Sequence, residues 1–322
     1  MRRASGLVLV LAAALGAAAA GPPRDAPFTL GVLRRDGILL PFAAFNGRDW
    51  RSPWPATGAD VALPIALRDV PTKWWGEAGA QAPWTSWIIG EGTLTPHPLA
   101  LRKPSVVRVF CGERLGIDTD YRGGAVDLRE PTVPKHGLAI ASAAGAVTLQ
   151  PVHDVSVLSP DAKRMIETIR DDFNDQEARA ARRFTRWYHP YNDHERQQYP
   201  IQLEAFYRAR DATARGAWTT SYVEAVRRFP PEPEDKDCGL ITFVRGWVIE
   251  REGREPVINI GARVTYCDRA DVSFMLPFGQ LLVGGESYWV YQLSSWRDEF
   301  YSVARVRPED VRPVVAVAGG GC

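Results

Sequence analysis

The sequence lacks the short motifs that mark the commonest catalytic and cofactor sites. It contains no GxSxG nucleophile elbow, no GxxxxGK phosphate loop and no GxGxxG dinucleotide fingerprint. No two cysteines are close enough for a CxxC pair, and no two histidines have the HExxH spacing of a zinc protease. We therefore expect neither a bound metal nor a cofactor, and no reaction can be named from motifs.

An excess of one charge is also absent. The chain has 39 Lys and Arg against 38 Asp and Glu, a formal net charge of +1, and no long run of either sign. Arginine outnumbers lysine by 34 to five, and with the abundant alanine, glycine and proline this indicates a GC-rich bacterial genome. Scattered arginines do not make the clustered basic face that nucleic-acid binding requires. We therefore exclude nucleic acid as an expected partner.

Only one long hydrophobic run is present, at the start of the chain. Arg2 and Arg3 precede the apolar residues 7–20, which end in small residues before Gly21. This pattern predicts a secretory signal peptide over residues 1–20, and the run is too short and alanine-rich for a membrane span. We predict an exported protein, periplasmic or extracellular, whose mature chain has no integral membrane segment.

Cysteine is scarce, but its even number suits an oxidising compartment, where disulfides are the expected state. The four residues are Cys111, Cys238, Cys267 and Cys322. Four cysteines permit three pairings, which cysteine spacing alone does not separate.

A hairpin selects one of these pairings. Residues 238–250 and 255–267 flank a polar turn that contains glycine, which is typical of two antiparallel strands. Centring the turn gives a register in which opposed residue numbers sum to 505, so that Cys238 faces Cys267. By elimination, the second disulfide is Cys111–Cys322. The register also places on one face the side chains of Ile241, Phe243, Trp247, Ile249, Ile258, Ile260, Ala262, Val264 and Tyr266.

Proline and glycine punctuate most of the chain at intervals too short for helices. Residues 21–157 form a Pro- and Trp-rich N-terminal β domain that opens with a hairpin of 28–33 and 38–45 around Asp-Gly. Residues 189–322 have the pattern of an antiparallel meander of about eight strands. We predict a mainly β, or α+β, fold with two antiparallel halves.

One long amphipathic helix is predicted between these halves, within residues 158–188 and over about 160–187. Ser159 is a suitable N-cap, Pro160 suits the first helical position, and Asp161 places an acid in the first turn. Apolar residues then recur at steps of three and four, which predicts one face packed on a sheet.

The densest group of polar side chains is the segment His189–Glu195, which includes His194 and lies in a predicted loop over residues 188–199. A second acidic group contains Asp118 and Asp120. Imidazole and carboxylate groups are the usual general acids and bases of hydrolysis. These five side chains, His189, His194, Glu195, Asp118 and Asp120, are therefore the candidate catalytic residues.

Six of the eleven tryptophans fall within 38 residues that are broken by proline and glycine. They are Trp50, Trp54, Trp74, Trp75, Trp84 and Trp87. Such a group either fills the core of a domain of short strands or forms an exposed platform for a glycan or protein ligand.

The sequence favours a non-catalytic binding or interaction protein of the bacterial periplasm or cell exterior, with an unknown protein or glycan as its ligand. The alternative is a hydrolase that acts on cell-envelope or extracellular polymer and uses the His189–Glu195 loop. Spatial convergence of the histidines and acids would favour the hydrolase, and a row of exposed tryptophans would favour the binding protein.

Overall fold

The computed structural model describes residues 25–55, 66–89, 94–125, 132–142, 147, 149–184, 189–213, 216–231, 238–270 and 272–322. The predicted signal peptide, residues 1–20, lies outside these ranges. No helix among the described residues is long and apolar enough to cross a membrane.

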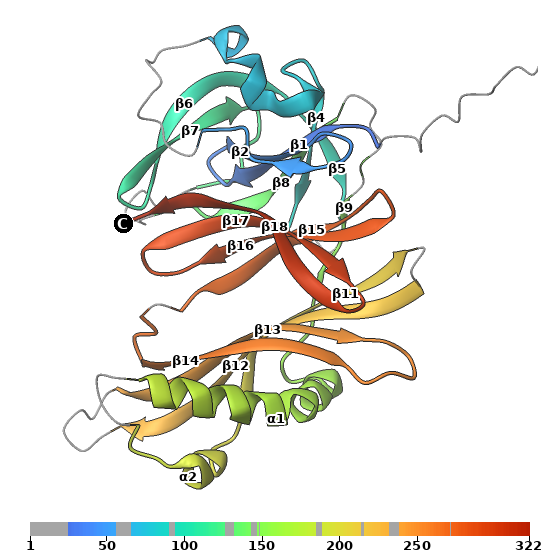
Figure 1. Ribbon diagram of the computed structural model, residues 1–322. Helices are drawn as coiled ribbons and strands as arrows, with labels where there is room; N and C mark the ends of the chain where they lie inside the picture. The colour runs from blue at the N-terminus through green and yellow to red at the C-terminus, as the bar shows by residue number, and fades with distance from the viewer. Residues whose placement is uncertain are drawn as a thin grey trace, which may run out of the picture.

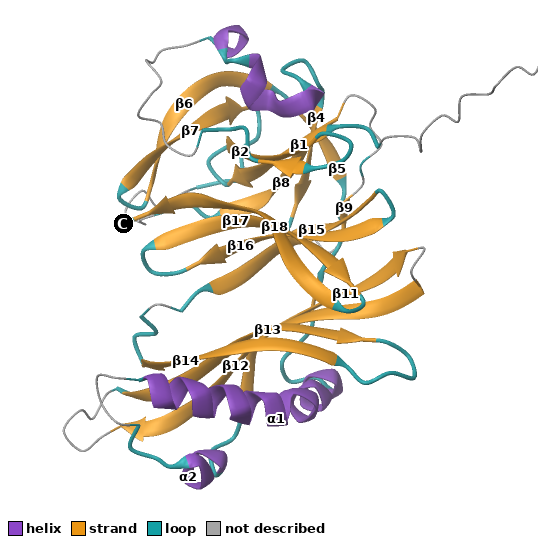
Figure 2. Cartoon of the chain, viewed as in Figure 1, coloured by secondary structure: helices purple, strands orange, loops and turns teal. Residues whose placement is uncertain are grey.

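The fold is mainly β, as predicted, with one long helix (Figures 1 and 2). The elements in chain order are β1 (Phe28–Arg34), β2 (Ile38–Phe45), β3 (Trp50–Arg51), η1 (Leu67–Asp69), η2 (Thr72–Ala78), β4 (Trp84–Ile88), β5 (Pro96–Leu99), β6 (Leu101–Val109), β7 (Gly112–Thr119), β8 (Lys135–Ser142), β9 (Leu149–Gln150), β10 (His153–Asp154), α1 (Pro160–Arg183), α2 (Asp193–Gln197), β11 (Gln202–Thr213), β12 (Gly216–Pro231), β13 (Gly239–Glu250), β14 (Val257–Tyr266), β15 (Phe274–Val283), β16 (Glu286–Ser294), β17 (Asp298–Arg307) and β18 (Asp310–Gly321).

Three antiparallel sheets are stacked in layers (Figure 1). The N-terminal sheet has the order β5-β4-β8-β1-β2-β7-β6, with β3 paired to β2. The middle sheet has the order β18-β17-β16-β15-β9, and the outer sheet has the order β10-β11-β12-β13-β14. The predicted eight-strand meander is therefore split after β14 into two sheets that pack face to face. In Figure 1, α1 covers the free face of the outer sheet.

The middle sheet is buried on both faces because side chains alternate along each strand. Tyr288 and Val290 of β16 pack on the N-terminal sheet, whereas Trp289 and Tyr291 pack on the outer sheet. The short strands β9 and β10, which precede α1 in sequence, pair with β15 and β11. The chain segment before the long helix thus contributes to both C-terminal sheets.

Helix α1 begins where the sequence predicts. The Ser159 hydroxyl accepts a hydrogen bond from the Ala162 N–H at 3.1 Å, and Pro160 occupies the first turn. Met165, Ile169 and Phe173 form the apolar side that packs on the outer sheet. The helix ends at Arg183, earlier than the predicted residue 187, because the backbone of Phe184 leaves helical geometry; residues 185–188 lie outside the described ranges.

Both predicted disulfides, Cys238–Cys267 and Cys111–Cys322, are present in the structure. The predicted register of the hairpin is wrong by one residue, because opposed residues of β13 and β14 sum to 506, as in Leu240 and Tyr266. The predicted shared face was therefore also wrong. The cysteines lie just beyond the ladder, with Cα atoms 5.2 Å apart, which is within the usual range for a disulfide.

The physical reason for the error is that β13 has two buried faces. Val244 and Val248 pack against α1, whereas Phe243 and Trp247 face the middle sheet. A strand that is apolar on both sides gives no alternation from which to choose between registers one residue apart.

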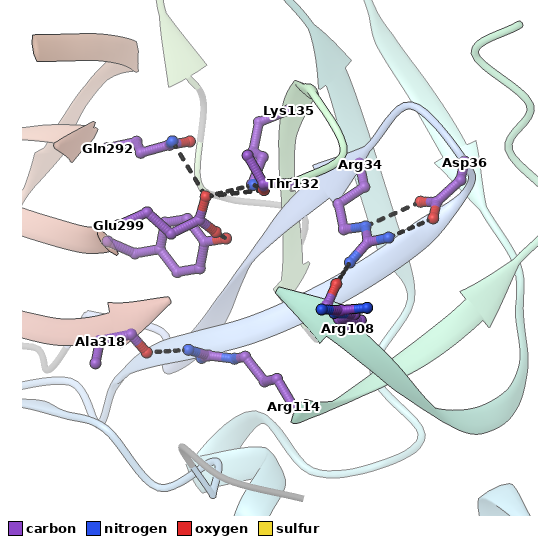
Figure 3. Close-up of polar contacts among 10 residues, drawn as sticks. Arg34, Asp36, Arg108, Arg114, Thr132, Lys135, Gln292, Glu299 and Ala318 are labelled. Carbon is purple, nitrogen blue, oxygen red and sulfur yellow. Dashed lines mark hydrogen bonds and ion pairs between the residues drawn. The ribbon is translucent and has the colours of Figure 1, made fainter. Parts of the chain in front are cut away.

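The N-terminal and middle sheets are joined by buried charged groups (Figure 3). The Lys135 ammonium lies 2.5 Å from the Glu299 carboxylate, and both side chains are almost wholly buried. Thr132 and Lys135 also share a hydrogen bond of 2.7 Å. In the same layer, the Arg114 guanidinium donates to the Ala318 carbonyl. Burial lowers the pKa of Lys135, while the neighbouring Glu299 opposes that shift.

A second buried network joins the outer and middle sheets. The Asp211 carboxylate accepts hydrogen bonds of 2.5 Å from Thr220, Gln280 and Ser287. Burial raises the pKa of Asp211, and these three hydrogen bonds oppose the rise. The network holds one end of the two facing sheets together.

Candidate functional site

The five candidate catalytic residues do not converge. Asp118 belongs to β7 and Asp120 follows it, whereas His194 and Glu195 belong to α2; these two elements lie at opposite ends of the molecule in Figure 1. Asp118 lies 3.8 Å from Arg122 in an ion pair, and Asp120 accepts a 2.9 Å hydrogen bond from the Ala100 N–H. A hydrolytic site that combines these residues therefore has no geometric basis.

The predicted loop at residues 188–199 contains a short helix, which is a correction to the sequence analysis. Asn192 caps α2 by accepting from the Glu195 N–H at 3.0 Å, and the Glu195 carboxylate accepts from the Asn192 N–H at 2.8 Å. This reciprocal capping box is visible in the sequence as Asn-x-x-Glu over residues 192–195, two residues after Pro190. The Glu195 carboxylate thus stabilises a helix end.

His189 packs among aromatic rings instead of facing a cleft with His194. Its ring centroid lies 4.9 Å from that of Phe229 and 6.1 Å from that of Tyr191. Burial, with a smaller contribution from Arg196, lowers the pKa of His189 to about 4. No group of three or more His, Cys, Asp or Glu among the described residues could hold a metal ion.

The tryptophan group mainly forms core. Trp54, Trp75, Trp84 and Trp87 are at most 5% exposed, and Trp50 and Trp74 are half-buried. The rings of Trp54, Trp75 and Trp84 pack edge to face, with Trp75 in the centre. They lie against the side of the N-terminal sheet that faces η2. None of these six rings is fully exposed, so the structure does not support an exposed tryptophan platform for a ligand.

A concave site with an aromatic lining lies elsewhere, between the outer and middle sheets. This inter-sheet cleft has a volume of about 460 Å³. Its walls are four aromatic side chains together with polar and small residues of β13, β14 and the segment before β15. The residues that carry the argument are Tyr222, Phe243, Arg245, Trp247, Gly261, Arg263 and Tyr291.

Strand register explains why these side chains share one wall. Tyr222 of β12 is opposite Trp247 of β13, and Glu224 is opposite Arg245. On the other side of β13, Gly261 of β14 is opposite Arg245. Directly opposed residues point to the same face of a sheet. A Cβ atom at Gly261 would meet nothing within 4 Å, so the missing side chain leaves the cleft open at this point.

Trp247 is the centre of an aromatic cluster beside the cleft. Its ring centroid lies 5.0 Å from Tyr222, 5.0 Å from Trp289 and 5.8 Å from Tyr291, and all three pairs meet edge to face. Trp289 is fully buried, whereas Trp247 is half-buried and lines the cleft. The wall is therefore a fixed aromatic surface that a ligand can contact without rearranging it.

Two charged side chains of the outer sheet are held by backbone groups at the cleft: Arg245, which lines it, and Glu224, which lies behind the lining. Arg245 donates to the Ser273 carbonyl at 2.8 Å, and the Glu224 carboxylate accepts from the Met275 N–H at 2.6 Å. Burial raises the pKa of Glu224 to about 7, although the Met275 N–H and Arg245 favour the ionised form. These bonds link the segment before β15 and its first residues to the outer sheet.

Sequence reasoning missed this cleft. A signal was present, since Glu224 and Arg245 each have apolar or small residues on both sides in the sequence, and a charged side chain in such a setting is a candidate functional residue. The sequence does not show that these two positions lie side by side.

Comparison with known protein families, curated proteins and solved structures found no match to this chain. The candidate site therefore rests on its own geometry and chemistry.

Proposed function

We propose that this chain is an exported bacterial binding protein whose ligand occupies the inter-sheet cleft, and that it acts without catalysing a reaction. The observation that carries the proposal is the cleft itself, which combines a fixed aromatic wall with an anchored arginine. Sites of this volume that are lined by aromatic groups and a few placed polar groups are the usual form of a small-ligand site. The two disulfides indicate an oxidising compartment, in keeping with export.

The chemistry of the lining supports binding over catalysis. Among the described residues that line the cleft there is no histidine, cysteine or carboxylate. Ser273 lines it, but no base from the lining accompanies its hydroxyl. The nearest acid, Glu224, is buried and accepts a hydrogen bond from Met275. Such a lining favours apolar groups of a ligand, and Arg245 can also accept a negative charge beside them.

The proposal can be tested with anilinonaphthalene sulfonate, an aromatic anion whose fluorescence rises in apolar sites. We expect saturable binding of one dye per native protein, measured by fluorescence titration. Gly261→Trp should fill the cleft and weaken binding at least about tenfold, because the position is open and its backbone is not left-handed. Gly261→Ala is the matched control and should bind like the wild type.

Two results would overturn this function. One is the absence of saturable binding to the folded wild-type protein. The other is equal binding to wild type and Gly261→Trp, provided that both unfold at the same temperature.

A further inference from the structure

We propose that the ligand is an extended peptide that adds to the outer sheet as a strand alongside β14. Its apolar side chains would enter the inter-sheet cleft, and its acidic side chains would enter a second groove on the other side of the strand. This inference rests on the proposed function, because it supplies the occupant of the same cleft.

The outer edge of β14 is available for pairing. The strand ends its sheet and, in the described part of the chain, pairs only with β13. It is ten residues long and its ladder has no register shift. Proteins usually protect such edges with proline, bulges or several charges, whereas β14 has Arg263 as its single charged residue. A long regular edge of this kind is a template for strand addition.

A second hollow, the helix-side groove, lies on the α1 side of β14 and has a volume of about 640 Å³. Arg179 and Arg183, one helical turn apart on α1, line it together with Val264 and Tyr266 of β14. Both arginines are exposed, and within the described ranges neither forms an ion pair. Asp268 is the only carboxylate among its described lining residues. The groove is therefore suited to carboxylates.

The two hollows lie on opposite faces of one strand. Gly261 lies on the face of β14 turned toward the inter-sheet cleft, and Val264 lies on the face turned toward α1. Ala262 and Arg263 border both. Side chains of an added strand also alternate, so successive residues would enter the cleft and the groove in turn. The matching peptide has apolar residues at every second position and Asp or Glu between them.

A second copy of this chain fits the edge less well. Antiparallel pairing of two β14 strands would place the α1 helices of both copies on the same side of a joined sheet. The exposed Arg179 and Arg183 of both copies would then lie on one face of the joined sheet, where like charges repel. An acidic peptide removes this repulsion instead of adding to it.

The experiment uses synthetic peptides of about eight residues that alternate valine with glutamate, and a matched series that alternates valine with lysine. Binding to the disulfide-bonded protein is measured by fluorescence anisotropy. We expect the glutamate peptide to bind at least tenfold more tightly than the lysine peptide. A glutamate peptide with N-methyl groups on alternate backbone nitrogens should lose binding, because it cannot pair with the edge of β14.

Charge reversal on α1 tests the groove. Arg179→Glu/Arg183→Glu should weaken the glutamate peptide about tenfold or more and favour the lysine peptide. Arg182→Glu is the control, since Arg182 is an exposed residue of the same helix that does not line the groove. Equal effects of the two variants would refute the groove assignment, and unchanged binding of the methylated peptide would refute strand addition.

The outcomes separate the two proposals. If the dye binds the cleft but no peptide binds, the inference about the peptide fails and the proposed function stands. If neither binds, both fail. A concentration-dependent dimer that Gly261→Trp abolishes, seen by analytical ultracentrifugation, would assign the edge to a second copy and overturn the peptide inference.

Discussion

Replacing the buried Glu224 by glutamine should change how the stability of this protein depends on pH. Glu224 is 3% exposed and its carboxylate has one hydrogen bond to the Met275 N–H. Burial raises its pKa from the ordinary value of 4.5 to about 7. Glutamine keeps the accepting oxygen and cannot ionise, so Glu224→Gln removes the titration while retaining the contact.

The direction of the effect follows from proton binding. Between about pH 4.5 and pH 7 the native state holds a proton on Glu224 that the unfolded chain has lost, so the free energy of unfolding falls as pH rises. This stabilisation is fully present below the unfolded-state pKa of 4.5 and is lost as the pH rises through the native-state pKa of about 7. Between about pH 5 and about pH 8, the titration of Glu224 lowers the free energy of unfolding by roughly 2.5 kcal/mol.

Urea unfolding of the disulfide-bonded protein, followed by tryptophan fluorescence, measures this effect. The stability of Glu224→Gln relative to wild type should increase by roughly 2.5 kcal/mol between about pH 5 and about pH 8. Glu255→Gln, at an exposed position after the β13–β14 turn, is the control and should follow the wild-type profile. Parallel profiles for wild type and Glu224→Gln would show that the buried carboxyl does not titrate in this range and would refute the reasoning.

Three further changes test the core and its cross-links. Replacing both cysteines of Cys111–Cys322 by alanine should lower the free energy of unfolding by about 5 kcal/mol in the chain-entropy description, because the bond closes a loop with a sequence separation of 211; an unchanged urea midpoint would contradict this. Lys135→Met should cost about 3–5 kcal/mol by leaving the buried Glu299 carboxylate unpaired, and adding Glu299→Leu should recover part of that loss in the same assay. Trp75→Ala should cost about 3–5 kcal/mol, whereas Trp296→Ala, at a residue 64% exposed, should change stability by less than about 0.5 kcal/mol; similar thermal shifts for both would argue against the tryptophan core.

Local features of the fold could be predicted from the sequence because each depends on a few adjacent residues. The Asp36-Gly37 turn indicates the β1–β2 hairpin, and Gly37 has a φ of 86°, which glycine adopts without a Cβ clash. Ser159 and Pro160 mark the start of α1. Cys238–Cys267 also follows from a local hairpin, and Cys111–Cys322 is then the remaining pair.

Long-range packing decided what local patterns do not specify. β13 is covered by α1 on one face and by the middle sheet on the other, so its apolar residues were compatible with two registers. The tryptophans near Trp75 were compatible with a core or with an exposed ligand platform. Their burial against the N-terminal sheet shows that they form core.

The sequence by itself therefore determined the β-rich class, the position of the long helix and the two disulfides. The tertiary structure alone decided the split of the C-terminal strands into two sheets, the separation of His189 from Asp118, and the cleft beside Trp247. The physical reason is that turns, caps and alternation act over a few residues, whereas a cleft is formed where strands distant in sequence pack and leave space, as at Gly261.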